Sequence, residues 1–313
     1  MMEKIPMRDG YGKALLELCG KNENVMVLDA DVAKSTRTVW IRDQYPEHFM
    51  DMGIAEQDMV GTAAGLSLSG MIPFVSTYCV FLAGRAWDQI RTTVCYNNLN
   101  VKFGGAHAGI SVGPDGATHQ SLEDVALTRV LPNMTVIVPC DAEETRTATL
   151  AMAKKEGPCF IRFGREAVPV VTDADTPFEI GKARLCRDGK DVTVFANGAM
   201  VYEALCAAEE LSSENIDVRV YDLHTIKPLD QEAILAAARE TGCIVTAEEH
   251  QKNGGMGSAV AECLAQTCPA PLEMVAVDDS FGESGQPEEL MQKYGLSKEA
   301  IIQKVKKVLS RKA

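Results

Sequence analysis

A single acidic residue, Glu56, follows a short Gly-Ile-Ala segment at 53–55 and precedes a Gly/Ala-rich stretch at 61–66. Burial at the head of such a small-residue helix disfavours the charged form of a carboxyl group, so the group can donate a proton near neutral pH. An acid in the first turn of a helix is also favoured simply by the helix dipole. The spacing therefore leaves two interpretations of Glu56, a proton donor in a site and a charge at a helix end.

A second chemical candidate is the glycine-dense segment 107–120, which contains two of the five histidines of the chain. Its many turn-forming residues disfavour a regular helix or strand, and loops held by a rigid scaffold often carry catalytic side chains. His107, Asp115 and His119 are its titratable residues. Metal binding is the alternative chemistry, but the spacing of these three residues is not one that zinc sites typically use.

The elements that position these residues are predicted from β-branched runs that alternate with helical patterns, which is typical of α/β units around a mostly parallel sheet. The predicted strands lie at 25–28, 72–75, 101–103, 135–138, 160–163, 192–196, 218–221, 244–247 and 274–277. A polar, proline-bearing stretch separates the fifth strand from the sixth. We therefore predict an α/β fold with two domains, 1–172 and 189–313, joined by a linker at 173–188.

Composition excludes several classes of partner. The formal net charge of -13 would repel nucleic acid and anionic membranes. The ten cysteines are scattered without a Cys-x-x-Cys pair, which indicates reduced thiols rather than a disulfide framework or a zinc site. No apolar run reaches membrane-spanning length, and residues 1–8 do not form a signal peptide. We expect a cytoplasmic protein.

The Gly-Ile-Ala-Glu-Gln element at 53–57 and the Asp-Gly-Ala-Thr-His-Gln string at 115–120 resemble the transketolase family. The resemblance implies a pyrimidine-binding domain with a mostly parallel sheet, followed by a smaller α/β domain of the transketolase C-terminal type. In that family, the glutamate matching Glu56 hydrogen-bonds the aminopyrimidine ring of thiamine diphosphate. The resemblance thus implies that Glu56 activates this cofactor, in agreement with the proton-donor interpretation.

Two aromatic residues, Tyr78 and Phe81, follow the predicted strand at 72–75 and match family positions that pack on the cofactor pyrimidine. Composition alone favours an ordinary core over a cofactor-binding wall for these two residues. Gly84 replaces a third aromatic residue that is frequent in the family. The positions of Asp115 and His119 imply contact with a sugar hydroxyl and with the reacting hydroxyl and carbonyl of the donor, respectively.

The resemblance also implies a binding site for the phosphate group of a sugar substrate. Guanidinium groups match phosphate oxygens in a bidentate manner, and hydroxyl and imidazole groups add directed hydrogen bonds. The four residues that match the phosphate-binding positions of the family are Arg8, Ser35, His107 and Arg165.

One element of the family is missing from this sequence, namely Gly-Asp-Gly with a downstream Asn, which holds the magnesium ion at the cofactor diphosphate. We therefore expect the Mg²⁺ ligands on a partner chain, the N-terminal subunit of a split transketolase. The expected assembly is a heterotetramer with two chains of each kind. A homodimer of this chain alone would bind thiamine diphosphate poorly.

The resulting expectation is a subunit that transfers a two-carbon ketol unit from a ketose phosphate to an aldose phosphate. A 1-deoxyxylulose-5-phosphate synthase and a pyruvate dehydrogenase β subunit are alternatives, since Arg-Ala-Trp-Asp-Gln at 85–89 is synthase-like, whereas His107 favours a transketolase. A non-catalytic scaffolding paralogue is an alternative of another class, against which Glu56 and His119 are both present. The C-terminal domain is expected to serve folding and assembly, without catalytic residues.

Overall fold

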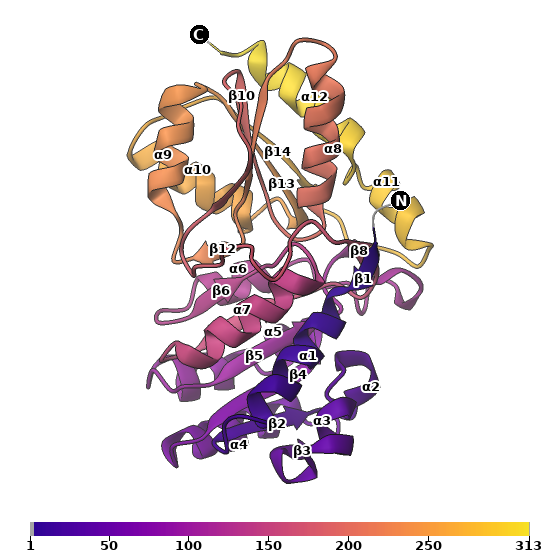
Figure 1. The fold of residues 1–313 in the computed structure, drawn as a ribbon, viewed down its shortest axis with the longest axis vertical. Helices are drawn as coiled ribbons and strands as arrows, with labels where there is room; N and C mark the ends of the chain where they lie inside the picture. Colours follow the sequence, from indigo (N-terminus) through magenta and orange to yellow (C-terminus); the bar gives the residue numbers. More distant parts are fainter. Residues whose placement is uncertain (1–2, 313) are drawn as a thin grey trace.

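The computed structural model describes residues 3–312 and contains two large sheets, one above the other in Figure 1. The lower, seven-stranded sheet has the order β12-β6-β7-β5-β4-β2-β3. Neighbouring strands are parallel except for β12, which is antiparallel to β6. Its strands are β2 (Val25–Asp29), β3 (Phe49–Asp51), β4 (Ile72–Tyr78), β5 (Lys102–Ala106), β6 (Thr135–Ile137), β7 (Cys159–Arg162) and β12 (Thr225–Lys227).

The upper sheet has five strands in the order β14-β13-β10-β11-β9, and only β9 runs antiparallel to its neighbour. These strands are β9 (Arg184–Arg187), β10 (Val192–Ala196), β11 (Val218–Asp222), β13 (Ile244–Gln251) and β14 (Leu272–Val277). A small antiparallel pair, β1 (Lys4–Pro6) with β8 (Ala167–Pro169), lies beside the level where the two sheets meet.

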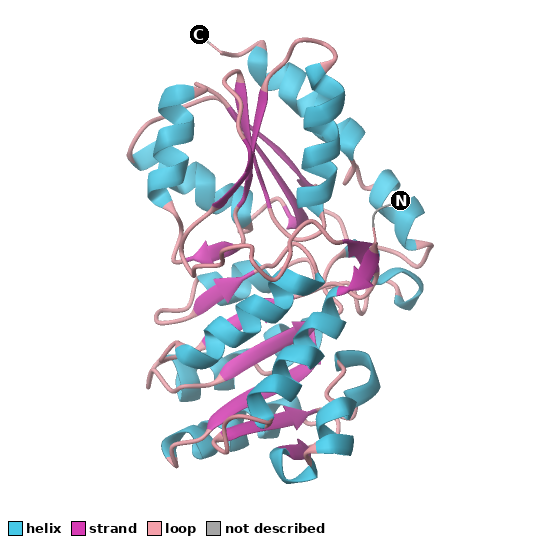
Figure 2. Cartoon of the chain, in the orientation of Figure 1, coloured by secondary structure: helices cyan, strands magenta, loops and turns pink. Residues whose placement is uncertain are grey.

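Helices flank both sheets (Figure 2). Helices α8 and α12 pack together on one side of the upper sheet, and α9 and α10 lie on the other. The helical elements of the first half are α1 (Met7–Cys19), α2 (Ala33–Thr36), α3 (Val39–Gln44), η1 (Pro46–His48), α4 (Glu56–Leu68), α5 (Cys79–Arg85), η2 (Gln89–Cys95), η3 (Ile110–Asp115), α6 (Asp124–Arg129) and α7 (Ala142–Lys154). Those of the second half are α8 (Met200–Ser212), α9 (Gln231–Glu240), α10 (Met256–Gln266), α11 (Pro287–Lys293) and α12 (Lys298–Leu309).

The predicted α/β fold class and all nine predicted strands are confirmed, with boundaries that shift by up to four residues. Five strands of three or four residues were not predicted, namely β1, β3, β8, β9 and β12, and the last two show the reason. Arg184–Arg187 falls in the predicted linker but forms β9, which covers the edge of β11. Thr225–Lys227 belongs to the second half of the chain but joins the first sheet as β12. The division at 172 and 189 remains a prediction.

The two halves share a hydrophobic core. One buried cluster contains Val136 and Val138 from the first half together with Leu223 and Ile226 from the second. Burial of this apolar surface fixes the halves against each other, because separating them would expose it to water.

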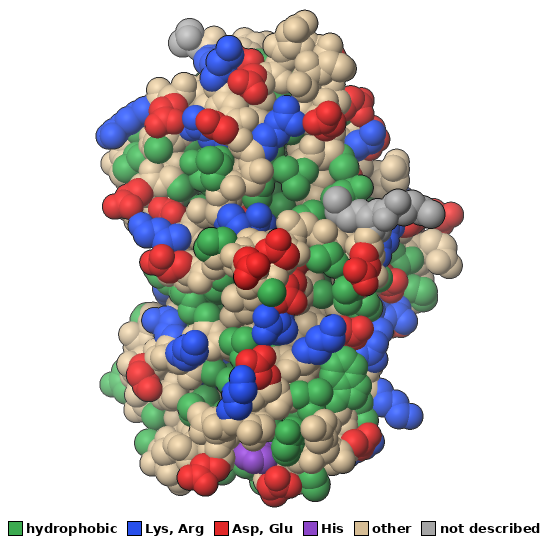
Figure 3. Space-filling view, in the orientation of Figure 1, with side chains coloured by type: hydrophobic (Ala, Val, Ile, Leu, Met, Phe, Trp, Pro, Cys, Tyr) green, Lys and Arg blue, Asp and Glu red, His purple; other side chains and the backbone are tan. Residues whose placement is uncertain are grey.

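Other expectations from composition can be compared with the structure. All ten cysteines are free thiols, and seven of them are buried. Within residues 3–312, no helix combines the length and the apolar character that crossing a bilayer would require. On the face shown in Figure 3, acidic and basic side chains are interspersed over both halves of the molecule.

A buried pair of carboxyl groups crosses the boundary between the halves. Glu144, on α7, accepts a hydrogen bond from Cys140 N at 2.7 Å, while Asp222, at the end of β11, contacts the Arg184 guanidinium at 3.0 Å. Burial, and next the negative charge of Asp222, raise the pKa of Glu144 to about 8. Ligand atoms of Cys140, Glu144 and Asp222 lie within 4.8 Å of one another. Since Arg184 already supplies a cation to both carboxyl groups, we assign no metal to this cluster.

Glu144→Gln is expected to reduce the loss of stability at alkaline pH. The folded chain retains on Glu144 a proton that the unfolded chain loses above its ordinary pKa of 4.5, so stability falls as pH rises from 4.5 to about 8. A glutamine stays neutral and keeps the hydrogen bonds. In urea unfolding at pH 5 and pH 8, we expect the difference in stability between the two pH values to shrink by about 3 kcal/mol in the variant. An identical pH dependence in both proteins would contradict this role.

Candidate functional site

The predicted site residues gather at the carboxyl edge of the lower sheet, where α/β proteins commonly bind ligands. Tyr78 ends β4, and His107 directly follows β5. Glu56 begins α4 after β3, and Ser35 lies on the short helix after β2. Since these strands are parallel, their carboxyl ends meet at the same edge and bring together residues far apart in the sequence.

Glu56 is buried, with 1% of its surface exposed, as predicted for the head of a small-residue helix. Its carboxylate accepts a hydrogen bond from Arg85 Nη1 at 2.7 Å. The same guanidinium lies 4.6 Å from the centre of the Phe81 ring. This ion pair was not predicted from the sequence. The spacing of four residues between Phe81 and Arg85 on α5 was the available signal for their contact.

Four rings form a continuous cluster next to this ion pair. Tyr78 stacks on His107 at 4.5 Å between ring centres, with an interplanar angle of 21°. His119 makes edge contacts with both Tyr78, at 5.9 Å, and Phe81, at 5.2 Å. Strand β4 ends at Tyr78, and Phe81 projects from the first turn of α5. The cluster offers flat aromatic surface beside a buried carboxyl group.

The opposite end of the cluster is basic. Tyr78 Oη lies 3.0 Å from Ser35 Oγ, and Arg8 Nη1 donates to Ser35 O at 3.4 Å. Arg8 Nη1 also lies 3.5 Å from His107 Nε2. His107 Nδ1 and Arg8 Nε are buried without a hydrogen-bond partner among the described residues. Buried polar atoms normally have partners, so His107 and Arg8 keep hydrogen-bonding capacity that the described residues do not satisfy.

The charge state of His107 follows from its surroundings. Burial, followed by the positive charges of Arg8 and Arg165, lowers its pKa to about 3, so the imidazole is neutral at physiological pH. Its backbone has a φ of 56°, a left-handed conformation that side chains rarely adopt. Such strain persists only where the surrounding structure enforces it, and it is frequent at ligand sites.

Two further guanidinium groups face this basic end. Arg165 donates to Val112 O at 2.9 Å, and Arg37 pairs with Asp9 at 2.6 Å. Burial, and next the charge of Arg37, lower the pKa of Arg8. Arg37 was not among the predicted site residues, because nothing in the sequence indicates that the loop after β2 turns it toward Arg8. Several cations in a chain with a net charge of -13 mark a local site for an anion.

The structure leaves one predicted residue outside this group. Asp115 is exposed at the end of η3, and no hydrogen bond or ion pair of its side chain occurs among residues 3–312. His119, four residues later, contacts the ring cluster, and its Nδ1 lies 2.9 Å from Thr118 Oγ1. The predicted contact between Asp115 and a sugar hydroxyl therefore stays a prediction.

These observations define an α/β chain with two sheets, whose candidate ligand site lies at the carboxyl edge of the first sheet. Residues 3–171 match the transketolase pyrimidine-binding domain, and residues 181–301 match the transketolase C-terminal domain. The chain belongs to the transketolase family. The resemblance seen in the elements at 53–57 and 115–120 is thereby confirmed.

Relatives of the chain include both half-length and full-length proteins. It is 42% identical over 311 residues to a 6-deoxy-6-sulfo-D-fructose transketolase subunit from Clostridium, covering 99% of this chain and 97% of that protein. It is 42% identical over 308 residues to mouse transketolase-like protein 2, covering 97% of this chain and 49% of the mouse protein. A solved structure described as a split gene transketolase, inactive β4 tetramer, superposes with a TM-score of 0.93 at 50% identity, covering 99% of this chain and 100% of the other.

Proposed function

We propose that the chain is a subunit of a thiamine-diphosphate-dependent transketolase, and that it acts on sugar phosphates. The observation that carries this proposal is the unbroken series of contacts from the Glu56–Arg85 pair, through the four rings, to Arg8 and Ser35. One end of the series suits a flat heterocycle and the other suits a phosphate. A ketol transferase needs both, because the cofactor and a phosphorylated sugar must meet in one site.

The cofactor end of the site would be formed by Glu56, Tyr78 and Phe81. Thiamine diphosphate, when bound, supplies a nucleophilic thiazolium carbon for attack on a ketose carbonyl. Glu56 would donate a proton to the pyrimidine ring from its buried position. Tyr78 and Phe81 would pack against the ring. Arg85 must release the Glu56 carboxyl group for this contact, and its side chain is 45% exposed, so it has room to turn toward solvent.

The substrate end would be formed by His107, His119 and the basic residues next to them. Arg8, Arg165 and the Ser35 hydroxyl would bind the phosphate of the sugar. Neutral His107 accepts the Arg8 hydrogen bond through Nε2, which would hold the Arg8 guanidinium in place for the phosphate. His119, at the junction of the two ends, would contact the reacting hydroxyl of the sugar. Asp115 would orient a second hydroxyl group.

The helix that begins with Glu56 provides the physical argument for a partner chain. A side chain at Gly61 or Gly65 would meet no atom within 4 Å, and both positions are exposed. Ile54 and Leu68, at the two ends of this surface, are 73% and 75% exposed. An apolar surface with glycines at its centre allows another backbone to approach closely. We propose that a separate N-terminal subunit covers this surface and supplies the Mg²⁺ and diphosphate ligands, in a cytoplasmic heterotetramer.

Gly61→Leu is expected to block assembly without destabilising the isolated chain. The leucine has open space in this chain, so the unfolding temperature should change little, whereas a partner backbone packed on the glycine would clash. We expect the Kd for the N-terminal subunit, measured by calorimetry, to rise by a factor of about 100 or more. Glu232→Leu, on the exposed face of α9, is the matched control. Equal binding by both variants would place the interface elsewhere.

The proposed activity is tested by co-expression with the N-terminal subunit and measurement of product formation. We expect turnover with xylulose 5-phosphate plus ribose 5-phosphate. Turnover only with pyruvate plus glyceraldehyde 3-phosphate would identify a 1-deoxyxylulose-5-phosphate synthase and reject the proposal. Tight partner binding with no turnover of either pair would favour a non-catalytic role.

A further inference from the structure

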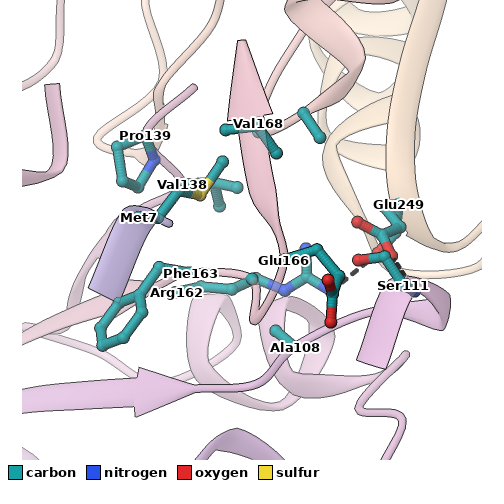
Figure 4. Close-up of a pocket in the computed structure, with 13 residues that line it drawn as sticks. Met7, Ala108, Ser111, Val138, Pro139, Arg162, Phe163, Glu166, Val168 and Glu249 are labelled. Atoms are coloured by element: carbon teal, nitrogen blue, oxygen red, sulfur yellow. Dashed lines mark hydrogen bonds between the residues drawn. The ribbon is translucent and has the colours of Figure 1, made fainter. Parts of the chain in front are cut away.

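The loop at 107–120 is held in place by residues of the second half of the chain. Glu249, on β13, accepts a hydrogen bond from Ser111 N at 2.6 Å (Figure 4). Gly109, two residues earlier, has a φ of 89°, and a Cβ atom there would lie 2.3 Å from the Glu249 carboxyl carbon. The Glu249 carboxyl group thus fills the space that only a glycine leaves free, so the loop and this side chain fit each other closely.

Two more contacts extend this attachment along the loop. Gln120 Nε2 donates both to Ile110 O, at 3.1 Å, and to Glu283 O, at 2.9 Å. Gly113 has a φ of 78° and packs against Pro287 at the start of α11. Apart from η3 and one isolated bridge between Ala108 and Ser121, the loop has no regular backbone pairing, so the conformation of its middle depends on these contacts.

Arg162 holds the backbone at Glu249 in place through a hydrogen bond. Its Nη2 donates to Glu249 O at 2.7 Å and to Ser121 O at 3.2 Å, and its Nε lies 2.7 Å from Asp124 Oδ2. Figure 4 shows the Arg162, Ser111 and Glu249 side chains meeting at one side of a pocket between the halves. Glu249 is 6% exposed; burial raises its pKa, while Arg162 acts in the opposite direction. The Arg162 hydrogen bond fixes the backbone at Glu249, and burial leaves the Glu249 carboxyl group little room to turn.

We propose that Glu249 is a positioning residue for the substrate-binding loop, so that the C-terminal half of the chain determines how His107 and His119 face the substrate. The inference rests on the proposed function and assigns to the C-terminal half a role beyond folding and assembly. Without Glu249, the amide of Ser111 loses its partner, and the loop gains conformations in which His119 no longer contacts Phe81. Loss of this hydrogen bond weakens substrate binding rather than cofactor binding.

The neighbouring residue provides a matched control. Glu248 is also buried on β13, but it accepts hydrogen bonds from Met256 N at 2.7 Å and Gly257 N at 2.8 Å, at the start of α10. Glu248→Ala therefore perturbs the same strand without touching the loop. Glu249→Gln keeps an oxygen that can accept from Ser111 N and serves as the conservative variant. Glu249→Asp keeps the charge but is too short to reach, and it replaces Glu249→Ala if that variant does not fold.

Hydrogen exchange followed by mass spectrometry tests the attachment in the chain itself. We expect exchange of peptides covering 107–120 to accelerate on the order of tenfold in Glu249→Ala and to remain close to wild type in Glu249→Gln. Glu248→Ala should accelerate exchange at 256–266 and leave the loop unchanged. Equal loop exchange in Glu249→Ala and wild type, or an equal effect of the two alanine variants on the loop, would overturn the inference.

Kinetics of the enzyme reconstituted with its N-terminal subunit test the functional consequence. In Glu249→Ala, we expect the KM for xylulose 5-phosphate to rise about tenfold or more, with the Kd for thiamine diphosphate unchanged and with recovery in Glu249→Gln. A looser loop with an unchanged KM would reject the positioning role. A wild-type enzyme without ketol transfer would reject the proposed function instead, while hydrogen exchange would still show whether Glu249 holds the loop.

Discussion

Glu56→Gln is expected to lower the turnover number of the reconstituted enzyme by a factor of about 100 to 10,000, the usual range for loss of a general acid. Glutamine matches the size of the buried side chain but has no acidic proton to give to the pyrimidine ring. It also removes the charge that holds Arg85 at 2.7 Å. The measurement is the turnover of xylulose 5-phosphate with ribose 5-phosphate at saturating thiamine diphosphate, so that weaker cofactor binding does not contribute.

Glu232→Gln is the control for this experiment. Glu232 lies in the first turn of α9 and is exposed, so the substitution removes a helix-end charge far from both the site and the proposed partner surface. We expect its turnover to be within about twofold of wild type, because exposed helix-end charges contribute only modestly. An equally active Glu56→Gln enzyme would show that Glu56 serves the helix and not the cofactor.

Arg8→Ala is expected to raise the KM for a phosphorylated sugar by a factor of about 10 to 100, the equivalent of one charge-assisted hydrogen bond. Arg8 lies at the basic end of the site, where its Nη1 contacts His107 Nε2 and donates to Ser35 O. The same sugar without its phosphate should show nearly the same KM in variant and wild type, because it makes no use of this cation. The comparison of the two substrates is therefore the decisive measurement.

Arg42→Ala controls for the loss of a positive charge from the surface. Arg42 is exposed, and within residues 3–312 its side chain pairs only with its neighbour Asp43, at 3.0 Å. Its removal should leave the KM for both sugars unchanged, since exposed charges are screened by salt. A KM that rises equally for both sugars in Arg8→Ala would show that Arg8 maintains the shape of the site and does not bind phosphate.

Local patterns in the sequence were sufficient for much of the fold. Alternation of β-branched runs with helical segments predicted nine strands, because strand and helix periodicity are properties of short windows. The same windows failed for β9 and β12, since strands of three or four residues carry too little pattern of their own. Each forms because a partner strand offers an unpaired edge, and the partner of β12 lies about 90 residues earlier in the chain.

In the candidate site, too, some features were predictable from the sequence and others depended on tertiary contacts. The sequence by itself determined that Glu56 heads a helix, that a glycine-rich loop carries His107 and His119, and that the chain lacks the magnesium-binding element of its family. Only the tertiary structure decided that Arg85 forms an ion pair with Glu56. It also decided that Glu249 accepts a hydrogen bond from Ser111 N, 138 residues earlier in the chain. Contacts of this kind depend on how the sheets pack, and side-chain spacing along the chain contains no information about such packing.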